Sequence, residues 1–453
     1  MSLKENVFHR SPYLVQNIAI TLFNSYQYKI RHGGNYKKFR KYYKKADQFD
    51  EKRLEKELNK RKLSFFKYVQ KNSIWYSDYN FKDFSKIDIL EKKDIVSNLN
   101  EIKTLDEEKG LVNLTSGSTG ASMKTVFTRS DMQERFAILD HFKSKHGFSL
   151  GKKTAWFSGK NLITENHIKN NICSHYDFHN KIRFYSTFHI SKKNFNIYWN
   201  SLNKFQPDFI VGFPSSVFEI CEIADSFNLR LSHKVKVFFT TSETVLPQHR
   251  EVINRVLGCK LVDQYASSEG APFMAECKNG NMHINPLTGI FEVVDEYMQP
   301  STEGEILVTS FTTRGTPLVR YRIGDRIKMA PRDKRCDCGS LFPIVESIEG
   351  RTKEFIYSPE RGRINLVNLG NSTKGLKGII CFQVIQDVES EVLVKMVVTN
   401  DFNKSQEEKF ISALRDRVGE KISINIQYVE NIPREKGGKF CIVKNNLVLE
   451  PKY

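Results

Sequence analysis

The run of small residues from Thr115 to Gly120, Thr-Ser-Gly-Ser-Thr-Gly, has the composition of a loop that wraps a polyphosphate. Glycines let the backbone approach an anion closely, consecutive N–H groups then point at the anion, and hydroxyls add uncharged donors. No Gly-Lys-Ser/Thr follows, so the run is not a Walker loop. On its own such a run more often marks an exposed turn. The candidate ligands are Thr115, Ser116, Gly117, Ser118, Thr119 and Gly120.

Two later segments carry groups that suit the rest of a nucleotide. In the segment 264–270, Tyr265 offers a flat face for a base, and Glu269, next to Ser268, offers a carboxylate for Mg²⁺. Asp325 follows a glycine where a strand is expected to end, and its carboxylate can accept hydrogen bonds from both hydroxyls of a ribose. The alternatives are an ordinary exposed glutamate and an aspartate in a β-turn.

A lysine near the C-terminus completes this set of chemical groups. The segment 433–439, Pro-Arg-Glu-Lys-Gly-Gly-Lys, places Lys439 directly after two glycines. A lysine on a glycine loop is a positive charge that the backbone can deliver to an anion. Where two anions must approach each other, cations aimed at the transition state lower the barrier. The alternative is one more surface lysine among many.

Three cysteines and one histidine have the composition of a structural zinc site. Cys336 and Cys338 are separated by one residue, and Cys277 and His283 lie upstream in a region expected to be rich in strands. A Cys₃His set suits tetrahedral Zn²⁺, and the one-residue gap is shorter than the usual spacing. Single cysteines and histidines are more often buried filler, so zinc is one of two open interpretations.

These groups lie far apart in the sequence, so a fold must bring them together. The pattern of residues 154–263 predicts such a fold. Short β-rich runs alternate there with helical stretches, the helices being expected after Pro214 and over residues 246–257. This alternation predicts a largely parallel sheet covered by helices, with ligands at the carboxyl ends of the strands. The expected strands are 154–157, 183–185, 209–211, 235–239 and 260–263.

Three further regions flank this α/β region. Residues 11–31 are expected to be helical, with Leu14, Ile18 and Leu22 on one face, and residues 35–62 to form a basic helical pair. Residues 290–330 are β-rich, with strands expected at 291–294, 305–309 and 318–322. The tail after about residue 375 combines strands with a helix opened by Ser405, which has Glu408 three residues on, as in a capping box.

The expected fold is therefore a large α/β N-terminal domain with mostly parallel sheets and a β-rich subdomain, followed by a small α+β C-terminal domain. We place a basic helical extension, packed on the large domain, at residues 1–85. The large domain spans 86–352, with its β-rich subdomain at about 285–350. The small mobile domain spans 353–453.

Composition limits the class of protein. The 70 lysines and arginines exceed the 52 acidic residues, which gives a formal charge of +18. This charge suits anionic ligands, acidic partners or an anionic membrane surface, and no motif for reading nucleic acid accompanies it. The eight cysteines are scattered, and neither a signal-peptide core nor an apolar run of about 20 residues is present. We therefore expect a cytoplasmic protein without a transmembrane segment.

The four nucleotide-related segments, in this order and at these separations, resemble the motifs of the adenylate-forming superfamily of acyl- and aryl-CoA synthetases. The resemblance covers about residues 85–445. Within the superfamily the chain is most similar to phenylacetate–CoA ligase-like proteins, in particular to the branch connected with capsular polysaccharide biosynthesis. Supporting segments are 90–94, Gly-Phe-Pro-Ser-Ser at 212–216 and Thr-Thr-Ser-Glu at 240–243. Lys124 follows the phosphate loop without the proline that is common in the family.

This resemblance implies a ligase that uses ATP and Mg²⁺. A small carboxylic acid and ATP would give an acyl-adenylate and pyrophosphate, after which CoA, a sugar or an amine would take the acyl group and release AMP. Residues 116–120 would wrap the β- and γ-phosphates, with Thr115 and Ser268 also at the nucleotide. Tyr265 would pack on adenine, and Glu269 would hold Mg²⁺ as a catalytic residue.

The same resemblance assigns roles to residues near the C-terminal domain. Asp325 and Arg351 would bind the ribose hydroxyls. Lys439 would be the catalytic cation that contacts the attacking carboxylate oxygen and the α-phosphate. Lys353 would be the hinge about which the small domain rotates before the second step. Some phenylacetate–CoA ligase-like proteins also have cysteines and a histidine placed like Cys277, His283, Cys336 and Cys338.

Three other functions stay open at this point. An aryl- or acyl-CoA ligase would use CoA as the acceptor in place of a sugar-linked or polymer-linked group. A catalytically degenerate homologue would bind a partner through the basic N-terminal helices, although Lys439, Asp325 and Glu269 are all retained. A nucleic-acid-binding protein is suggested by charge alone. The acid itself is expected to contact residues 156–179 and 211–216, with His175 and His179 as polar candidates.

Overall fold

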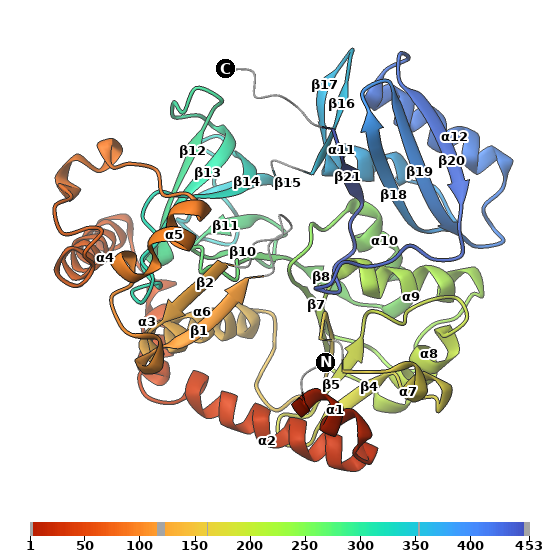
Figure 1. Cartoon of the computed structure of the whole chain (residues 1–453), viewed down its shortest axis with the longest axis horizontal. Coiled ribbons are helices and arrows are strands. Elements are labelled where there is room, and N and C mark those ends of the chain that lie inside the picture. The colour runs from red at the N-terminus through yellow and green to blue at the C-terminus, as the bar shows by residue number, and fades with distance from the viewer. Residues whose placement is uncertain (1–2, 116–122, 161, 352–353, 448–453) are drawn as a thin grey trace. The chain divides into compact units, whose positions relative to one another are not determined.

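The structure is a computed structural model that describes residues 3–115, 123–160, 162–351 and 354–447. It divides into two compact units, each made of segments that are not consecutive in the chain (Figure 1). Unit 1 contains Met1–Leu22, Leu150–Val262 and Glu349–Tyr453, and unit 2 contains Phe23–Ser149 and Asp263–Ile348. The divisions expected at residues 85 and 352 stay predictions.

A six-stranded sheet with the order β4-β5-β3-β6-β7-β8 forms the centre of unit 1. All neighbouring strands are parallel except the edge strand β4, which runs antiparallel to β5. Every residue of β6 and β7 is buried, as expected for parallel strands covered on both faces. The largely parallel sheet predicted from the sequence is confirmed. Its strands are β3 (Thr154–Ser158), β4 (Ser174–Asp177), β5 (Ile182–Ser186), β6 (Phe209–Gly212), β7 (Val237–Thr240) and β8 (Lys260–Val262).

Helices α7 (Glu165–Lys169), α8 (Phe195–Phe205), α9 (Pro214–Ser226) and α10 (Pro247–Leu257) pack with this sheet in one hydrophobic core. Pro214 and Pro247 occupy the first turn of their helices, where a missing N–H leaves no bond unmade. Because α9 and α10 begin directly after β6 and close behind β7, their first turns lie near the carboxyl ends of these strands.

The C-terminal part of unit 1 is a four-stranded sheet with the order β20-β19-β18-β21, covered by α12 (Lys404–Val418) (Figure 1). Phe410, Leu414 and Val418 form the buried stripe of α12, as their spacing predicts. The predicted cap was wrong: Asn403 caps α12 by accepting a hydrogen bond from the N–H of Gln406 at 3.2 Å, and Ser405 is already helical. The other elements are β16 (Phe355–Ser358), β17 (Gly362–Asn365), α11 (Leu366–Gly370), β18 (Ile379–Val388), β19 (Glu391–Val398), β20 (Ser423–Tyr428) and β21 (Val443–Asn445).

Unit 2 is built on a seven-stranded sheet with the order β12-β13-β14-β15-β11-β10-β9, and its β1 (Leu111–Thr115) and β2 (Met123–Phe127) form a separate antiparallel pair. Strand β14 begins at Tyr321, later than expected, because Arg320 has a left-handed φ of 46° that interrupts the extended chain. The strands of the large sheet are β9 (Gln264–Tyr265), β10 (Met274–Glu276), β11 (Met282–Ile284), β12 (Gly289–Val294), β13 (Glu303–Ser310), β14 (Tyr321–Met329) and β15 (Ile344–Arg351).

The N-terminal helices are α1 (Leu3–Arg10), α2 (Tyr13–His32), α3 (Tyr36–Ala46) and α4 (Glu51–Asn72), followed by α5 (Lys92–Ile102) and α6 (Arg129–Lys145). The basic helical pair predicted over 35–62 corresponds to α3 and α4, and the helix predicted over 11–31 corresponds to α2. Among the described residues, no helix is both long and apolar enough to cross a membrane.

Candidate active site and metal centre

The groups expected to bind the nucleoside, Tyr265 and Asp325, touch each other in unit 2. The Tyr265 hydroxyl donates a hydrogen bond of 2.6 Å to an Asp325 carboxylate oxygen. Their strands, β9 and β14, are separated by three others in the sheet order, a span of about 19 Å in a flat sheet. The sheet therefore curls, and its curvature joins two segments that lie far apart along the chain.

Strand β1 brings the start of the hydroxyl–glycine loop to the same place. The side-chain amide of Asn113 on β1 donates to the carbonyl oxygen of Ser268 at 2.7 Å. Glu269 follows in that segment and is half-buried. Ser116, Gly117, Ser118, Thr119 and Gly120 lie outside the described residues, as does the side chain of Thr115. Lys124, on β2, pairs with Glu107 at 3.0 Å.

A half-buried arginine for which the sequence pattern predicts no role holds the segment that carries Glu269 in place. Arg135, on α6, donates to the carbonyl oxygens of Gly270 at 2.8 Å, Ala271 at 3.0 Å and Ser267 at 3.3 Å. Burial lowers the pKa of the guanidinium to about 10, so it stays charged at neutral pH. Because the acceptors lie on both sides of Glu269, Arg135 sets the path of the main chain around this carboxylate. Nothing in the spacing of α6 distinguishes it from an ordinary surface arginine.

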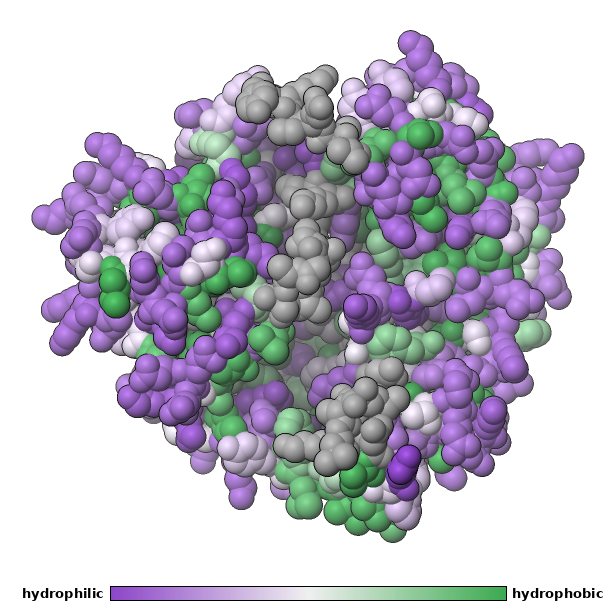
Figure 2. All heavy atoms as spheres, in the orientation of Figure 1, coloured by the Kyte–Doolittle hydropathy of each residue, from purple (hydrophilic) through white to green (hydrophobic). Residues whose placement is uncertain are grey.

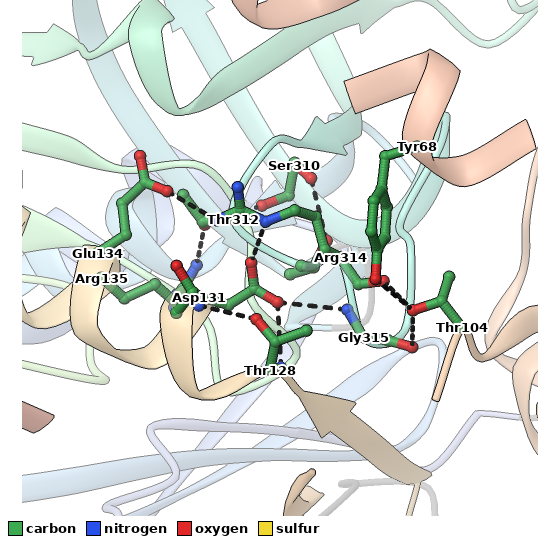
Figure 3. A network of polar contacts seen from close by, with 12 residues as sticks. Tyr68, Thr104, Thr128, Asp131, Glu134, Arg135, Ser310, Thr312, Arg314 and Gly315 are labelled. Atoms are coloured by element: carbon green, nitrogen blue, oxygen red, sulfur yellow. Dashed lines mark hydrogen bonds and ion pairs between the residues drawn. The ribbon is translucent and has the colours of Figure 1, made fainter. Parts of the chain in front are cut away.

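Buried carboxylates on the same helix hold this region together. Figure 3 shows Asp131 and Glu134 of α6 on the side that faces Arg314, whose guanidinium binds Asp131 at 2.6 Å and Glu134 at 2.9 Å. Arg61 of the basic helix α4 adds an ion pair of 2.6 Å to Glu134. Burial by itself raises the pKa of Glu134, but Arg61 and Arg314 outweigh it and lower the pKa below its ordinary value. Helix α4 therefore stabilises the position of α6, the helix that carries Arg135.

The Lys439 loop belongs to unit 1, where it lies against the end of β3. A Cβ at position 159, directly after this strand, would overlap the carbonyl oxygen of Gly437, so only a glycine allows the contact. Gly438 has a φ of +74°, and its carbonyl oxygen accepts a hydrogen bond from the Thr187 hydroxyl at 3.3 Å. The carboxyl ends of parallel strands are the usual place for ligands in such sheets.

Glu243, just beyond β7, binds the same loop through a hydrogen bond. One carboxylate oxygen accepts the N–H of Phe440 at 2.9 Å, and the other accepts the N–H of Ser215, in the first turn of α9, at 3.1 Å. Arg434, at the other end of the loop, forms a buried ion pair of 2.6 Å with Glu219. Burial raises the pKa of Glu243, and the charge of Arg434 opposes that effect. Sequence analysis quoted Glu243 only as part of a motif.

The remaining predicted residues are placed less completely. Arg351 ends β15, but its side chain is not described, and Lys353 lies outside the described residues. Lys439 itself is half-buried, and among the described residues its ammonium forms no hydrogen bond or ion pair. His175, a polar candidate for the acid pocket, is fully buried next to Asn17, 3.0 Å from its side-chain oxygen, and packs in the core.

A small pocket, partly open to solvent, lies between α9, α10, β18 and the Lys439 loop. Its wall is mainly apolar, with the Glu219–Arg434 pair and Glu222 as charged members. The side-chain oxygen of Gln248, also in the lining, is buried and has no hydrogen-bond partner among the described residues. The C-terminal part of unit 1 therefore does not fill the space above these helices.

The four predicted zinc ligands converge in unit 2, with their ligand atoms all within 4.8 Å of one another. The sulfurs of Cys277 and Cys336 are 3.7 Å apart, and the Cys338 sulfur is 3.5 Å from Nε2 of His283. A tetrahedral zinc with ordinary bond lengths requires about 3.8 Å and about 3.6 Å for these two separations. Nδ1 of His283 lies 2.9 Å from the carbonyl oxygen of Phe342, which fixes the ring with Nε2 towards the sulfurs. The residues fit the metal.

The fold is that of the adenylate-forming CoA ligases. The structure resembles a 2-hydroxyisobutyryl-CoA ligase in its postadenylation state in complex with 2-HIB-AMP, with a TM-score of 0.70, 15% identity and coverage of 87% of this chain and 90% of that chain. It also resembles the same ligase in the thioesterification state with 2-HIB-AMP and CoA, with a TM-score of 0.57, 15% identity and coverage of 88% and 91%.

Sequence comparison points to a narrower group. Protein CapK of Staphylococcus aureus is 29% identical to the chain over 454 residues, which is 97% of this chain and 99% of CapK. Residues 356–446 match the family model of the CapK C-terminal domain. The resemblance to adenylate-forming ligases is confirmed: the chain has their fold, is similar to CapK over nearly its whole length, and matches the CapK C-terminal domain over residues 356–446.

Proposed function

We propose that this protein is an AMP-forming ligase that activates a small carboxylic acid with ATP as an acyl-adenylate and then transfers the acyl group to an acceptor. The observation that carries the proposal is the docking of the Lys439 loop on Gly159, at the carboxyl end of a parallel strand. The resemblance to CapK suggests an acceptor in capsular or surface polysaccharide biosynthesis. CoA is the alternative acceptor, as in phenylacetate–CoA ligases.

In the first step, the acid carboxylate attacks the α-phosphorus of ATP and pyrophosphate leaves. Both reactants are anions, so the barrier is largely electrostatic, and the ammonium of Lys439 would neutralise the charge that builds up between them. Glu269 would hold Mg²⁺, which supplies positive charge to the phosphates. Arg135 would act as a positioning residue, because it holds the carbonyl oxygens on both sides of Glu269.

The nucleoside would lie on unit 2. Tyr265 would pack against adenine, and Asp325, already fixed by the Tyr265 hydroxyl, would accept hydrogen bonds from the ribose. Ser268 lies beside the start of the phosphate-binding loop, where residues 115–120 would supply N–H and hydroxyl donors. Arg351 would assist at the ribose, and Lys353 would be the hinge for the second step.

We further propose that Cys277, His283, Cys336 and Cys338 hold a structural Zn²⁺. The metal would join β10, β11 and the segment that precedes β15, and it would take no part in catalysis. Metal analysis of the purified protein should find about one zinc per chain. Cys336→Ser should remove it and lower the unfolding temperature, while Cys381→Ser, which alters a cysteine outside the group, should leave the zinc content unchanged.

Exchange of labelled pyrophosphate into ATP tests the ligase directly, because exchange requires adenylation of an added acid. One chemical class of acid should stimulate exchange, and Lys439→Ala should slow it a few-hundredfold, as loss of about 3–4 kcal/mol of transition-state stabilisation predicts. Lys436→Ala, which removes a neighbouring exposed lysine, is the matched control and should have little effect.

Mass spectrometry of a metabolite extract incubated with ATP and the protein should then identify the acyl-adenylate and hence the acid. If no acid supports exchange and the Lys439→Ala protein behaves like the wild type, the ligase proposal fails. The remaining candidate would then be a degenerate homologue, in which deletion of residues 1–80 abolishes partner binding.

A further inference from the structure

Helix α2 has polar side chains inside the protein and large apolar side chains outside. Gln16 and Asn17 are only 2% and 4% exposed. Six large apolar residues of the helix are instead between 46% and 66% exposed, while Tyr13, Ile20, Tyr28 and Ile30 are half-buried. The six exposed residues are Leu14, Val15, Ile18, Leu22, Phe23 and Tyr26, which we call the α2 apolar face.

The inward polar side has a structural reason. Strand β4 is the edge of the six-stranded sheet, and an edge strand presents backbone N–H groups that need acceptors. The side-chain oxygen of Asn17 accepts the N–H of Tyr176 at 3.0 Å, and the hydroxyl oxygen of Thr21 accepts the N–H of Phe178 at 3.1 Å. Turning the helix to bury its apolar residues would leave these donors without partners.

The exposed apolar residues form one surface. At 100° per residue, the α2 apolar face covers about half of the helix circumference, and its only exposed charge is Lys29 near the C-terminal end. Figure 2 shows hydrophobic surface along the lower edge, where Figure 1 places α2. Scattered exposed apolar residues are normal, but a continuous apolar helix face indicates an interaction site.

All charged residues of the next helix, α3, are positively charged. The sequence of α3, Tyr-Lys-Lys-Phe-Arg-Lys-Tyr-Tyr-Lys-Lys-Ala, contains no acidic residue, and only a short glycine turn separates it from α2. All five of its lysines are exposed and form no ion pair within the described part of the chain. They are Lys37, Lys38, Lys41, Lys44 and Lys45, which we call the α3 lysines.

We propose that the α2 apolar face and the α3 lysines attach the protein to the surface of a bilayer that contains anionic phospholipids, with α2 lying in the plane of the interface. A bilayer matches both features, because its acyl chains take the apolar side chains and its headgroups take the lysines. A second copy of this chain would cover the apolar residues and leave the lysines unmatched. The net charge of +18 adds long-range attraction in the same direction.

Vesicle flotation with the full chain tests this proposal. The probes are vesicles of phosphatidylcholine alone and of phosphatidylcholine with phosphatidylglycerol, at low and high salt. The wild type should float with the anionic vesicles at low salt and detach at high salt. Ile18→Gln with Leu22→Gln should lower the partition coefficient about 100-fold, and Lys37→Ala with Lys38→Ala and Lys41→Ala should lower it about as much.

Leu63→Gln is the matched control, because Leu63 is 69% exposed on helix α4, outside the α2 apolar face. This variant should float like the wild type, and all variants should keep the wild-type unfolding temperature, since only exposed side chains are changed. Failure of the wild type to bind either vesicle, or equal binding to both, would overturn the proposal. So would light scattering that shows a wild-type dimer and a monomeric Ile18→Gln/Leu22→Gln protein, because the α2 apolar face would then join two copies.

Discussion

The two loops proposed to act on ATP are held in place by different means. The segment around Glu269 is fixed by the half-buried Arg135 of a neighbouring helix, which binds main-chain carbonyl oxygens. The Lys439 loop is fixed by contact between glycines, Gly159 against Gly437, and by carboxylates that bind the two ends of the loop. The first loop is held by an arginine that binds its main chain, whereas the tip of the second is held by close contact between glycines and only its ends are held by carboxylates.

This difference has a mechanical meaning. Removing the Glu269 segment from Arg135 would leave a buried charge unpaired, which costs several kcal/mol. Lifting only the tip of the Lys439 loop from Gly159 exposes glycine backbone, which water can solvate, and leaves the buried Glu219–Arg434 ion pair at the end of the loop formed. Under the proposed reaction, the first loop stays in place through both steps, and the second leaves after adenylation so that the acceptor can enter.

The largest effect is expected when the docking of the Lys439 loop on Gly159 is prevented. In Gly159→Ala, the added methyl group overlaps the Gly437 carbonyl, so Lys439 can no longer reach its place. We expect adenylation to slow about as much as in Lys439→Ala, a few-hundredfold. Pyrophosphate exchange measures this step. Transfer from a synthetic acyl-adenylate should persist in the variant, and its loss together with adenylation would show that Gly159 serves both steps.

Substitution of Arg135 tests the fixed loop. Arg135→Met fills similar volume but leaves the carbonyl oxygens of Gly270 and Ala271 without their donor. The free energy of unfolding should fall by about 3 kcal/mol, and ATP binding should weaken with it. Urea unfolding and nucleotide titration measure the two effects. Arg129→Met, an exposed arginine on the same helix, is the control and should change neither quantity.

A smaller effect is expected at Glu243. Glu243→Gln keeps one acceptor oxygen and loses the charge, so only one of the N–H groups of Ser215 and Phe440 keeps a good partner. Adenylation should slow about tenfold, since one charge-assisted hydrogen bond contributes about 1.5 kcal/mol. Glu251→Gln, on the exposed side of α10, should leave the rate unchanged. An effect of the same size in both variants would show that Glu243 has no specific role.

The smallest expected effect concerns the contact between α9 and the C-terminal part of unit 1, and it is measured as the pH dependence of stability. Glu222 accepts the N–H of Gly378 at 2.8 Å, and burial raises its pKa from 4.5 to about 7, with Asp225 and Asp401 acting in the same direction and Arg255 against it. The folded protein therefore holds a proton that the unfolded chain releases, and stability falls as the pH rises through this range. Between about pH 6 and pH 8 the loss should be about 1 kcal/mol.

Glu222→Gln keeps an oxygen for Gly378 and removes the titration, so this slope should disappear. Urea unfolding at a series of pH values compares the two proteins. An unchanged slope in the variant would assign the pH dependence to another group.

Local pattern was sufficient for much of the fold. The stripe of Phe410, Leu414 and Val418 predicts the buried side of α12 because their spacing places them on one face. The alternation of strands and helices predicts the parallel sheet for the same kind of reason. The cap of α12 was misplaced by two residues because Asn403 and Ser405 are both good caps, and only the backbone conformation distinguishes them.

The sequence suggests candidate site residues where the residue type itself carries the chemistry. Tyr265, Glu269, Asp325 and Lys439 each bear a group that a nucleotide reaction needs, and the cysteines and histidine are ligands by nature. The roles of Arg135 and Glu243 could not be predicted from the sequence, because their hydrogen-bond partners lie more than 20 residues away in the chain. The sequence does not show that Arg135 is less exposed than Arg129 on the same helix.

Local geometry and covalent structure fix which residues share a face of a helix and which groups are available for chemistry, so both can be read from the sequence. Which face of a helix is covered depends on packing against distant segments. In α2 the polar face is covered, because Asn17 and Thr21 accept hydrogen bonds from backbone N–H groups at and just beyond the edge strand β4.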